Sequence, residues 1–113
     1  MASFENLGTA GAYDNLIADT KVVTALTEFV TAASDMTRGT LATVAGGKAT
    51  KATAEAGDNY VVITDDVKAN GKVTAYKSGN FIRQTVEAAT GIELTAAVEE
   101  AARKDNISFV DAN

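Results

Sequence analysis

The sequence has 113 residues and a net charge of −5, and it contains no cysteine, histidine, proline or tryptophan. These absences exclude disulfides, thiolate zinc sites and imidazole chemistry, and they leave oxygen-ligand sites for Ca²⁺ or Mg²⁺ as the compatible metal sites. A chain of this length forms one domain, and its acidic balance opposes nucleic-acid binding, which depends on cationic contacts to phosphate. We therefore expect no enzyme, no cofactor and no nucleic-acid partner.

Aromatic residues make up only 6% of the chain, which predicts a thin core that gains stability from a partner or an oligomer. No apolar run approaches the ~20 residues of a membrane span, so no membrane partner is expected. The first residues do not resemble a secretory signal, and this predicts synthesis and folding in the cytoplasm.

Residues 1–18 are expected to form an extended N-terminal arm, and residues 19–113 a single β-rich domain. The arm contains a near-repeat, in which an aromatic residue, an acidic residue, Asn and Leu follow one another twice. Its candidate docking residues are Phe4, Leu7, Tyr13, Asp14, Asn15, Leu16 and Ile17. Such an arm packs poorly in the isolated protein and orders when it adds to the sheet edge of a partner. The alternative is a coincidental match in a flexible tail.

Residues 20–36 favour strand because they are rich in Val and Thr, although a helix competes over 23–30. The runs 38–45 and 48–52 flank Gly46-Gly47 and predict a hairpin. A phosphate-binding loop at Gly46-Gly47-Lys48 is the alternative, but it lacks the required glycine spacing.

Residues 60–64 are the most apolar run and predict a buried strand, which ends at Asp65-Asp66. Adjacent carboxylates in a strand point to opposite faces, so we interpret this pair as a solvated strand end rather than a metal site. Asn70-Gly71 is a strong hairpin signal, and strict alternation follows over 72–77. A turn at Gly79 then leads into a predicted strand over 81–86 and a turn over 88–91.

The clearest helix is predicted over 96–104, with Thr95 as its N-cap and Val98 on a narrow apolar stripe. Glu99 and Glu100 each precede a basic residue by four positions, which predicts exposed ion pairs along the helix. A strand over 107–110 closes the chain. The residues expected to form structural turns are Gly39, Gly46, Gly47, Asn70, Gly71, Gly79 and Asn106. The fold class is therefore α+β and mostly β, with one helix in the C-terminal half.

A family resemblance rests on an ordered set of short motifs, at 13–17, Arg38-Gly39, Gly46-Gly47-Lys48, 65–67, 75–81, 91–95 and 103–107. In this order the chain resembles the head decoration proteins of tailed bacteriophages, the lambda-like capsid cementing family, and the related domain of phage head-fibre proteins. The resemblance covers residues 13–111. The chain departs from the family pattern at Asn106, where the family favours Gly, and in the extra segment before Tyr13.

The resemblance implies a small β-tulip-like domain that binds the major capsid protein on the outer surface of the virion. It also implies homotrimers at threefold sites of the expanded head, which stabilise the shell against the pressure of packaged DNA. The alternative function is a phage or cell surface module for adhesion or glycan binding. Such a module would need exposed aromatic rings, for which Tyr60 and Tyr76 are the candidates.

Overall fold

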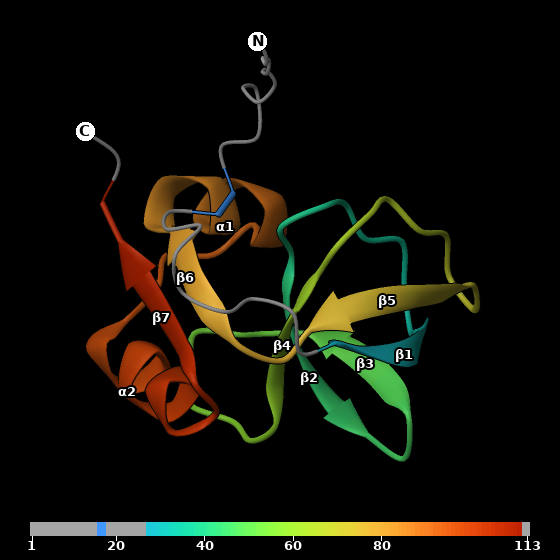
Figure 1. Ribbon diagram of the computed structural model, residues 1–113, viewed down its shortest axis with the longest axis horizontal. Coiled ribbons are helices and arrows are strands. Elements are labelled where there is room, and N and C mark those ends of the chain that lie inside the picture. Colours follow the sequence, from blue (N-terminus) through green and yellow to red (C-terminus); the bar gives the residue numbers. More distant parts are fainter. Residues whose placement is uncertain (1–15, 18–26, 112–113) are drawn as a thin grey trace, which may run out of the picture.

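The computed structural model describes residues 16–17 and 27–111. The elements, shown in Figure 1, are β1 (Thr27–Ala32), β2 (Leu41–Ala45), β3 (Lys48–Lys51), β4 (Tyr60–Ile63), β5 (Lys72–Tyr76), β6 (Gly79–Ile82), α1 (Arg83–Thr90), α2 (Ala96–Lys104) and β7 (Ile107–Val110). The small, mostly β character expected from the sequence is confirmed. The expectation of one helix is wrong, because α1 and α2 are both present in the described part of the chain.

Five strands form a closed barrel in the order β1-β3-β2-β4-β5. The barrel closes through the antiparallel pair β1–β5, while β1 and β3 run parallel. Its interior is filled mainly by Val and small Ala side chains: Val30, Ala32, Met36, Ala42, Ala49, Val61, Ile63, Val73 and Ala75. A barrel of so few strands has a narrow interior, so the many alanines suit it.

A second layer covers one side of this barrel. It consists of the parallel pair β6–β7 with the two helices, and Figure 1 shows it on the opposite half of the molecule from β1, β3 and β5. A second core fills the space between the layers, where Leu41, Tyr60 and Val62 on the outside of the barrel meet side chains such as Phe81 and Val98. The outer wall of the barrel is therefore covered on one side by protein, and β1 lies on the other.

Leu16 and Ile17 belong to the second layer. The Leu16 side chain is only 1% exposed, and the Leu16 carbonyl accepts a hydrogen bond of 2.7 Å from the Ile82 amide. Ile17 forms an antiparallel bridge with Phe81. These contacts correct the expectation that this part of the arm packs poorly, and the expected boundary after residue 18 cuts off two residues that belong to the domain.

The region after β6 is the largest departure from the sequence-based expectation. A strand was predicted over 81–86 and a turn over 88–91, but the chain turns into α1 at Arg83. Val86 is fully buried in the second core, and the Thr90 hydroxyl accepts a hydrogen bond of 2.8 Å from the Leu41 amide. These contacts come from distant parts of the sequence, and they outweigh the local preference of Thr and Val for strand. Gly91, with φ of 82°, ends the helix.

Other local predictions are confirmed. β2 and β3 form the hairpin around Gly46-Gly47, β4 is buried along its whole length, and residues 27–32 form a strand rather than a helix. The Thr95 hydroxyl caps α2 by accepting a hydrogen bond of 3.2 Å from the Val98 amide. The strand predicted over 21–26 lies outside the described residues.

Most of the predicted turn residues adopt the left-handed backbone that their type favours. Positive φ angles occur at Gly39, Gly46, Gly47, Asn70, Gly79 and Asn106. Gly71 has a different role, because its amide donates to the Lys68 carbonyl at 2.9 Å and an added Cβ would lie 2.9 Å from the same oxygen. Asn70-Gly71 therefore completes a turn over 68–71 inside a longer β4–β5 connection, rather than a two-residue hairpin.

Candidate interaction surface

The side of the barrel away from the second layer carries an exposed aromatic ring. Phe29, in the middle of β1, is 76% exposed, and it points outward because Val30 and Ala32 point into the barrel. Thr74 of β5 lies directly opposite Phe29 in the antiparallel pair. Among the described residues the other exposed large apolar side chain is Val110, at 40%. An aromatic ring this exposed is a candidate contact residue for a partner.

Threonines and lysines lie beside Phe29 on the outer face of the barrel, and Tyr76 of β5, which pairs with Thr27, lies on the same face. Thr27 and Thr31 lie on the same face of β1, and Thr31 is opposite both Lys72 of β5 and Lys48 of β3. We call this surface the β1 wall, and it consists of Thr27, Phe29, Thr31, Lys48, Lys72 and Thr74. The β1 wall is therefore polar and cationic around one apolar ring, although the whole chain is acidic.

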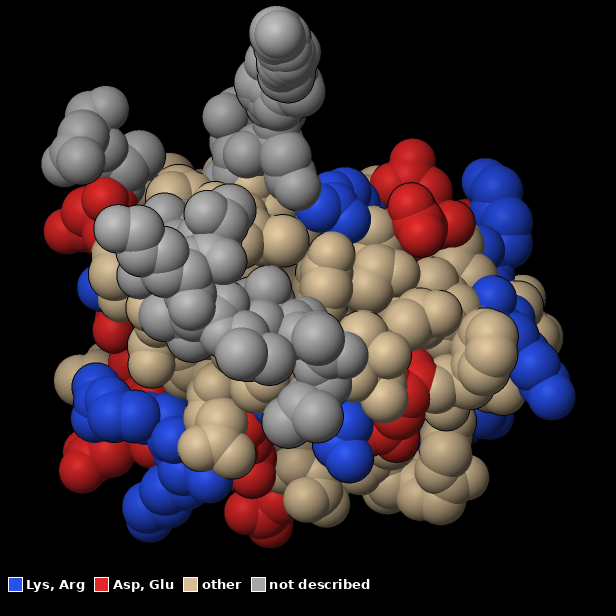
Figure 2. All heavy atoms as spheres, viewed as in Figure 1, with Lys and Arg blue, Asp and Glu red and all other residues tan. Residues whose placement is uncertain are grey.

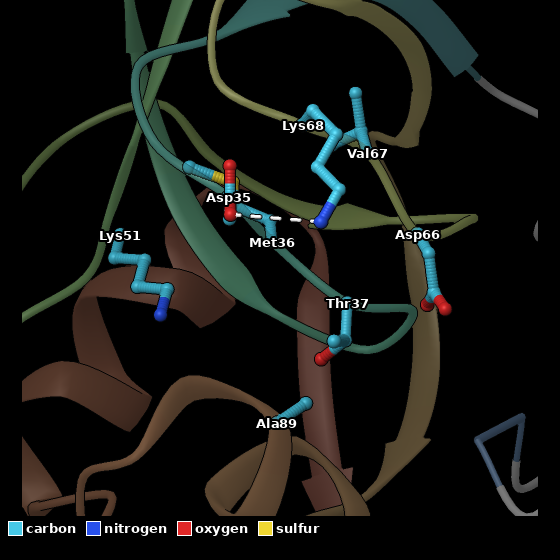
Figure 3. Close-up of a pocket in the computed structure, with 8 residues that line it drawn as sticks. All are labelled: Asp35, Met36, Thr37, Lys51, Asp66, Val67, Lys68 and Ala89. Atoms are coloured by element: carbon cyan, nitrogen blue, oxygen red, sulfur yellow. Dashed lines mark ion pairs between the residues drawn. The ribbon is translucent and has the colours of Figure 1, made fainter.

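A groove of about 520 Å³ opens close to the end of β1. It is lined by Asp35, Met36, Thr37, Lys51, Asp66, Val67, Lys68 and Ala89, and we call it the Met36 groove (Figure 3). Figure 3 shows Lys51 and Asp66 on opposite sides of the groove, with Ala89 at one edge. Its lining therefore combines apolar surface with charges of both signs.

Hydrogen bonds hold the two carboxylates of the Met36 groove. Asp35 accepts a bond of 2.8 Å from the Ala69 amide, and the Lys68 ammonium lies 3.9 Å from the same carboxylate. Asp66 accepts a bond of 3.0 Å from the Arg38 amide. Asp66 thus holds two loops together, and no third acidic residue joins Asp65-Asp66 to form a metal site among the described residues.

A second hollow of about 470 Å³ lies between the barrel and the end of α2. It contains the ion pair between Lys77 and Glu28, at 4.0 Å, and the Asp105 carboxylate, which accepts a bond of 2.9 Å from the Tyr60 amide. These polar groups already bind one another. Lys104 and Asn106 also line the hollow.

Arg83 is the centre of the charged contacts in the second layer. Its guanidinium pairs with Glu99 of α2, and its Nε donates to Asp111 at 2.7 Å. Hydrogen bonds from Arg83 and then Gln84 hold the pKa of Asp111 below its ordinary value, and the positive charge of Arg83 adds to this effect. Glu99 was expected to form an exposed pair within its own helix. Its pairing with Arg83 corrects this, since the Glu99 side chain is only 19% exposed.

The charged surface is mixed rather than concentrated. On the face drawn in Figure 2, acidic and basic side chains lie among one another, with uncharged surface between them. No helix in the described part of the chain is both long enough and apolar enough to cross a bilayer. This face has no broad basic field of the kind that binds nucleic-acid backbones.

The candidate docking and sugar-binding residues lie in different environments. Phe4, Leu7, Tyr13, Asp14 and Asn15 lie outside the described residues. The Leu16 side chain is buried in the second core, and the partly buried Ile17 packs against the same core. Tyr60 is only 2% exposed and offers no open ring to a sugar, whereas Tyr76 is half-buried with its ring 5.7 Å from the Phe81 ring.

Sequence reasoning missed Phe29 as a surface residue. The signal was present in the alternation of residues 27–32, which places Phe29 with Thr27 and Thr31 and opposite the small apolar residues.

A comparison with protein-family models finds no matching family, and a comparison with curated proteins finds no significant match.

Proposed function

We propose that this protein is a decoration protein of a phage head. It binds the major capsid protein on the outside of the expanded shell, as homotrimers at threefold sites, and it cements the shell against internal pressure. The observation that carries the proposal is the ordered set of turn motifs in the sequence. The backbone supports it, because Gly46, Gly79 and Asn106 take positive φ angles at positions within these motifs.

The architecture is compatible with a cementing role. A closed barrel leaves none of its own strand edges unpaired, which suits a protein that is displayed in many copies without aggregating. A trimer that touches several capsid subunits adds interface area at each site. Several simultaneous contacts bind much more tightly together than each contact does alone. The excess of acidic residues suits an outer surface that does not contact DNA.

The proposal is tested with expanded shells that lack the protein. Purified protein is added, and its binding is measured by co-sedimentation while shell melting is followed by calorimetry. We expect saturable binding and a higher melting temperature of the shell, because a ligand that binds only the intact state stabilises it. Shells that have not expanded serve as the control. If the protein neither co-sediments with expanded shells nor raises their melting temperature, the proposal is wrong.

A further inference from the structure

We propose that both units of the near-repeat bind at one site in the second layer, and that Leu7 takes the place of Leu16 there when the units exchange. The first unit is residues 4–7 and the second unit is residues 13–16. We call the place the Leu16 site, and it is formed by Gly39, Phe81, Ile82, Thr85 and Ala89. The inference does not depend on the proposed function, because it concerns contacts within one chain.

The Leu16 site encloses one leucine side chain. Leu16 is 1% exposed, and a Cβ on Gly39 would lie 3.3 Å from its Cδ1. Side-chain carbons of Ala89 and Thr85 border the same space, at 3.5 and 3.7 Å from that Cβ position. Packed sites tolerate best a side chain of the same volume and shape. The site therefore selects leucine.

The other contacts of the site are made by the main chain. The Leu16 carbonyl accepts a hydrogen bond of 2.7 Å from the Ile82 amide. Ile17 forms the antiparallel bridge with Phe81. When a strand is added to a sheet, main-chain bonds supply affinity and side-chain pockets supply specificity. The first unit meets both requirements, because it ends in leucine and because Gly8 has the backbone groups that the bridge needs.

The two units match along their length. Each has an aromatic residue, an acidic residue, Asn and Leu in that order, and two small residues precede each unit, Ala2-Ser3 and Gly11-Ala12. They differ after the leucine, where the second unit is followed by Ile17 and the first by Gly8. Ile17 packs against the second core, so the second unit binds more tightly and occupies the site in the structure.

Exchange of the units costs little in chain entropy. Residues 18–26 connect Ile17 to β1, and residues 9–26 connect Gly8 to β1 after the exchange, so the connection doubles in length. Doubling a connection makes its closure about threefold less favourable. The preference for the second unit therefore comes mainly from Ile17.

The exchange removes a conflict between folding and docking. Leu16 and Ile17 were expected to contact a partner, but Leu16 is buried in the second core. Withdrawing a buried leucine leaves a cavity, which is destabilising. With Leu7 in the Leu16 site, the second unit is released for a partner while the core stays filled.

Gly8→Ile tests the inference in a chain whose core is unchanged. It gives both units the same Leu-Ile ending, so the first unit should occupy the site in roughly one quarter of the molecules, as the longer connection dictates. The leucine methyl groups of the full chain are labelled, and their NOEs to Gly39 are recorded by NMR. We expect NOEs from Leu16 in the wild type and from both Leu7 and Leu16 in Gly8→Ile. Gly8→Ile combined with Leu7→Ala is the matched control and should show Leu16 alone.

Urea denaturation gives an independent measurement. In the wild type, Leu16→Ala should lower the folding equilibrium constant about thirtyfold or more, as the loss of a buried leucine does. In the Gly8→Ile chain the first unit takes over, so Leu16→Ala should lower that constant only about fourfold. Adding Leu7→Ala to this chain should restore the full loss, whereas adding Thr9→Ala, outside the unit, should have no effect.

Two results would each overturn the inference. One is a Gly8→Ile chain without an NOE between Leu7 and Gly39, and the other is a Leu16→Ala change that destabilises this chain as much as it destabilises the wild type. Neither measurement uses shells. Co-sedimentation of the wild type with expanded shells is measured separately, so a failure of the exchange leaves the proposed function standing.

Discussion

Arg83 shows how one side chain joins several elements. It lies at the start of α1, and its guanidinium binds Glu99 of α2 and Asp111 beyond the end of β7. Its side chain and that of Glu99 are 25% and 19% exposed, so their pair is shielded from solvent more than an ordinary surface pair. The contact fixes the two helices relative to each other.

Glu99 and the neighbouring Glu100 offer a matched comparison for this contact. Glu99→Ala should lower the free energy of unfolding by about 1–2 kcal/mol, because it leaves a charge-assisted hydrogen bond of Arg83 unmade. Glu100→Ala, at an exposed position of the same helix, should cost less than about 0.5 kcal/mol. Urea denaturation of both variants measures the difference. Equal midpoints would show that the Arg83 contact adds nothing.

The lowered pKa of Asp111 predicts how this contact depends on pH. Arg83 and Gln84 favour the charged carboxylate in the folded state, so the stabilisation is present above the ordinary Asp pKa of 3.8 and is lost as the pH falls through the lower folded value. Asp111→Asn should therefore be less stable than the wild type at neutral pH, and the difference should shrink in acid. Thermal unfolding of both proteins across this range measures it, and a constant difference at all pH values would contradict the assignment.

At the scale of elements, the sequence was informative wherever local chemistry decides the outcome. The Gly46-Gly47 turn, the Thr95 cap and the wholly apolar β4 each have a signal within a few residues, and each was predicted. The helix α1 was not, because its stability comes from Val86 in the second core and from the bond between Thr90 and Leu41. The same reason explains Leu16, whose burial depends on side chains from distant parts of the sequence.

Thr90 tests the proposed origin of α1. Its hydroxyl is the acceptor for the buried Leu41 amide, so Thr90→Val keeps the shape of the side chain and leaves that amide without its partner. An unsatisfied buried amide costs about 1–3 kcal/mol, and the variant should be destabilised by that amount. Thr43→Val, on the half-buried part of β2, makes the same chemical change as a control and should have little effect on the denaturation midpoint. If Thr90→Val leaves the denaturation midpoint unchanged, the bond between Thr90 and Leu41 does not stabilise α1.

At the scale of the whole molecule, two cores share the barrel wall. One fills the barrel, and the other lies between β2, β4 and the second layer, where Leu16 contributes a side chain from far away in the sequence. Gly39 is part of this packing, because a Cβ there would lie 3.3 Å from Leu16 Cδ1. Leu16 therefore packs directly against Gly39, in the segment that leads into β2 of the barrel.

Deletions that end on either side of Leu16 separate folding from docking. Removing residues 1–18 should lower the denaturation midpoint clearly, and Leu16→Ala should cost about 2–5 kcal/mol, because a buried leucine leaves a cavity. Removing residues 1–15 keeps Leu16 and should leave the midpoint nearly unchanged, while it should weaken shell binding at least tenfold if Phe4 and Tyr13 are the docking residues that the sequence predicts. Denaturation and co-sedimentation measure the two effects. A fully stable 1–18 deletion would contradict the structural role of Leu16.

The pairing around β6 has a consequence for how the chain can be reconnected. Leu16 is hydrogen-bonded to Ile82, and Ile82 is paired with Val110 on its other side, so the two ends of the described chain flank one strand. Two strand spacings separate them, about 10 Å, which a peptide of about four residues spans. Residues 16–17 run antiparallel to β6, whereas β7 runs parallel to it. The chain therefore enters at Leu16 and leaves after Val110 at the same end of β6. A circular permutant that joins these ends and opens the chain between Gly46 and Gly47 should therefore keep both cores.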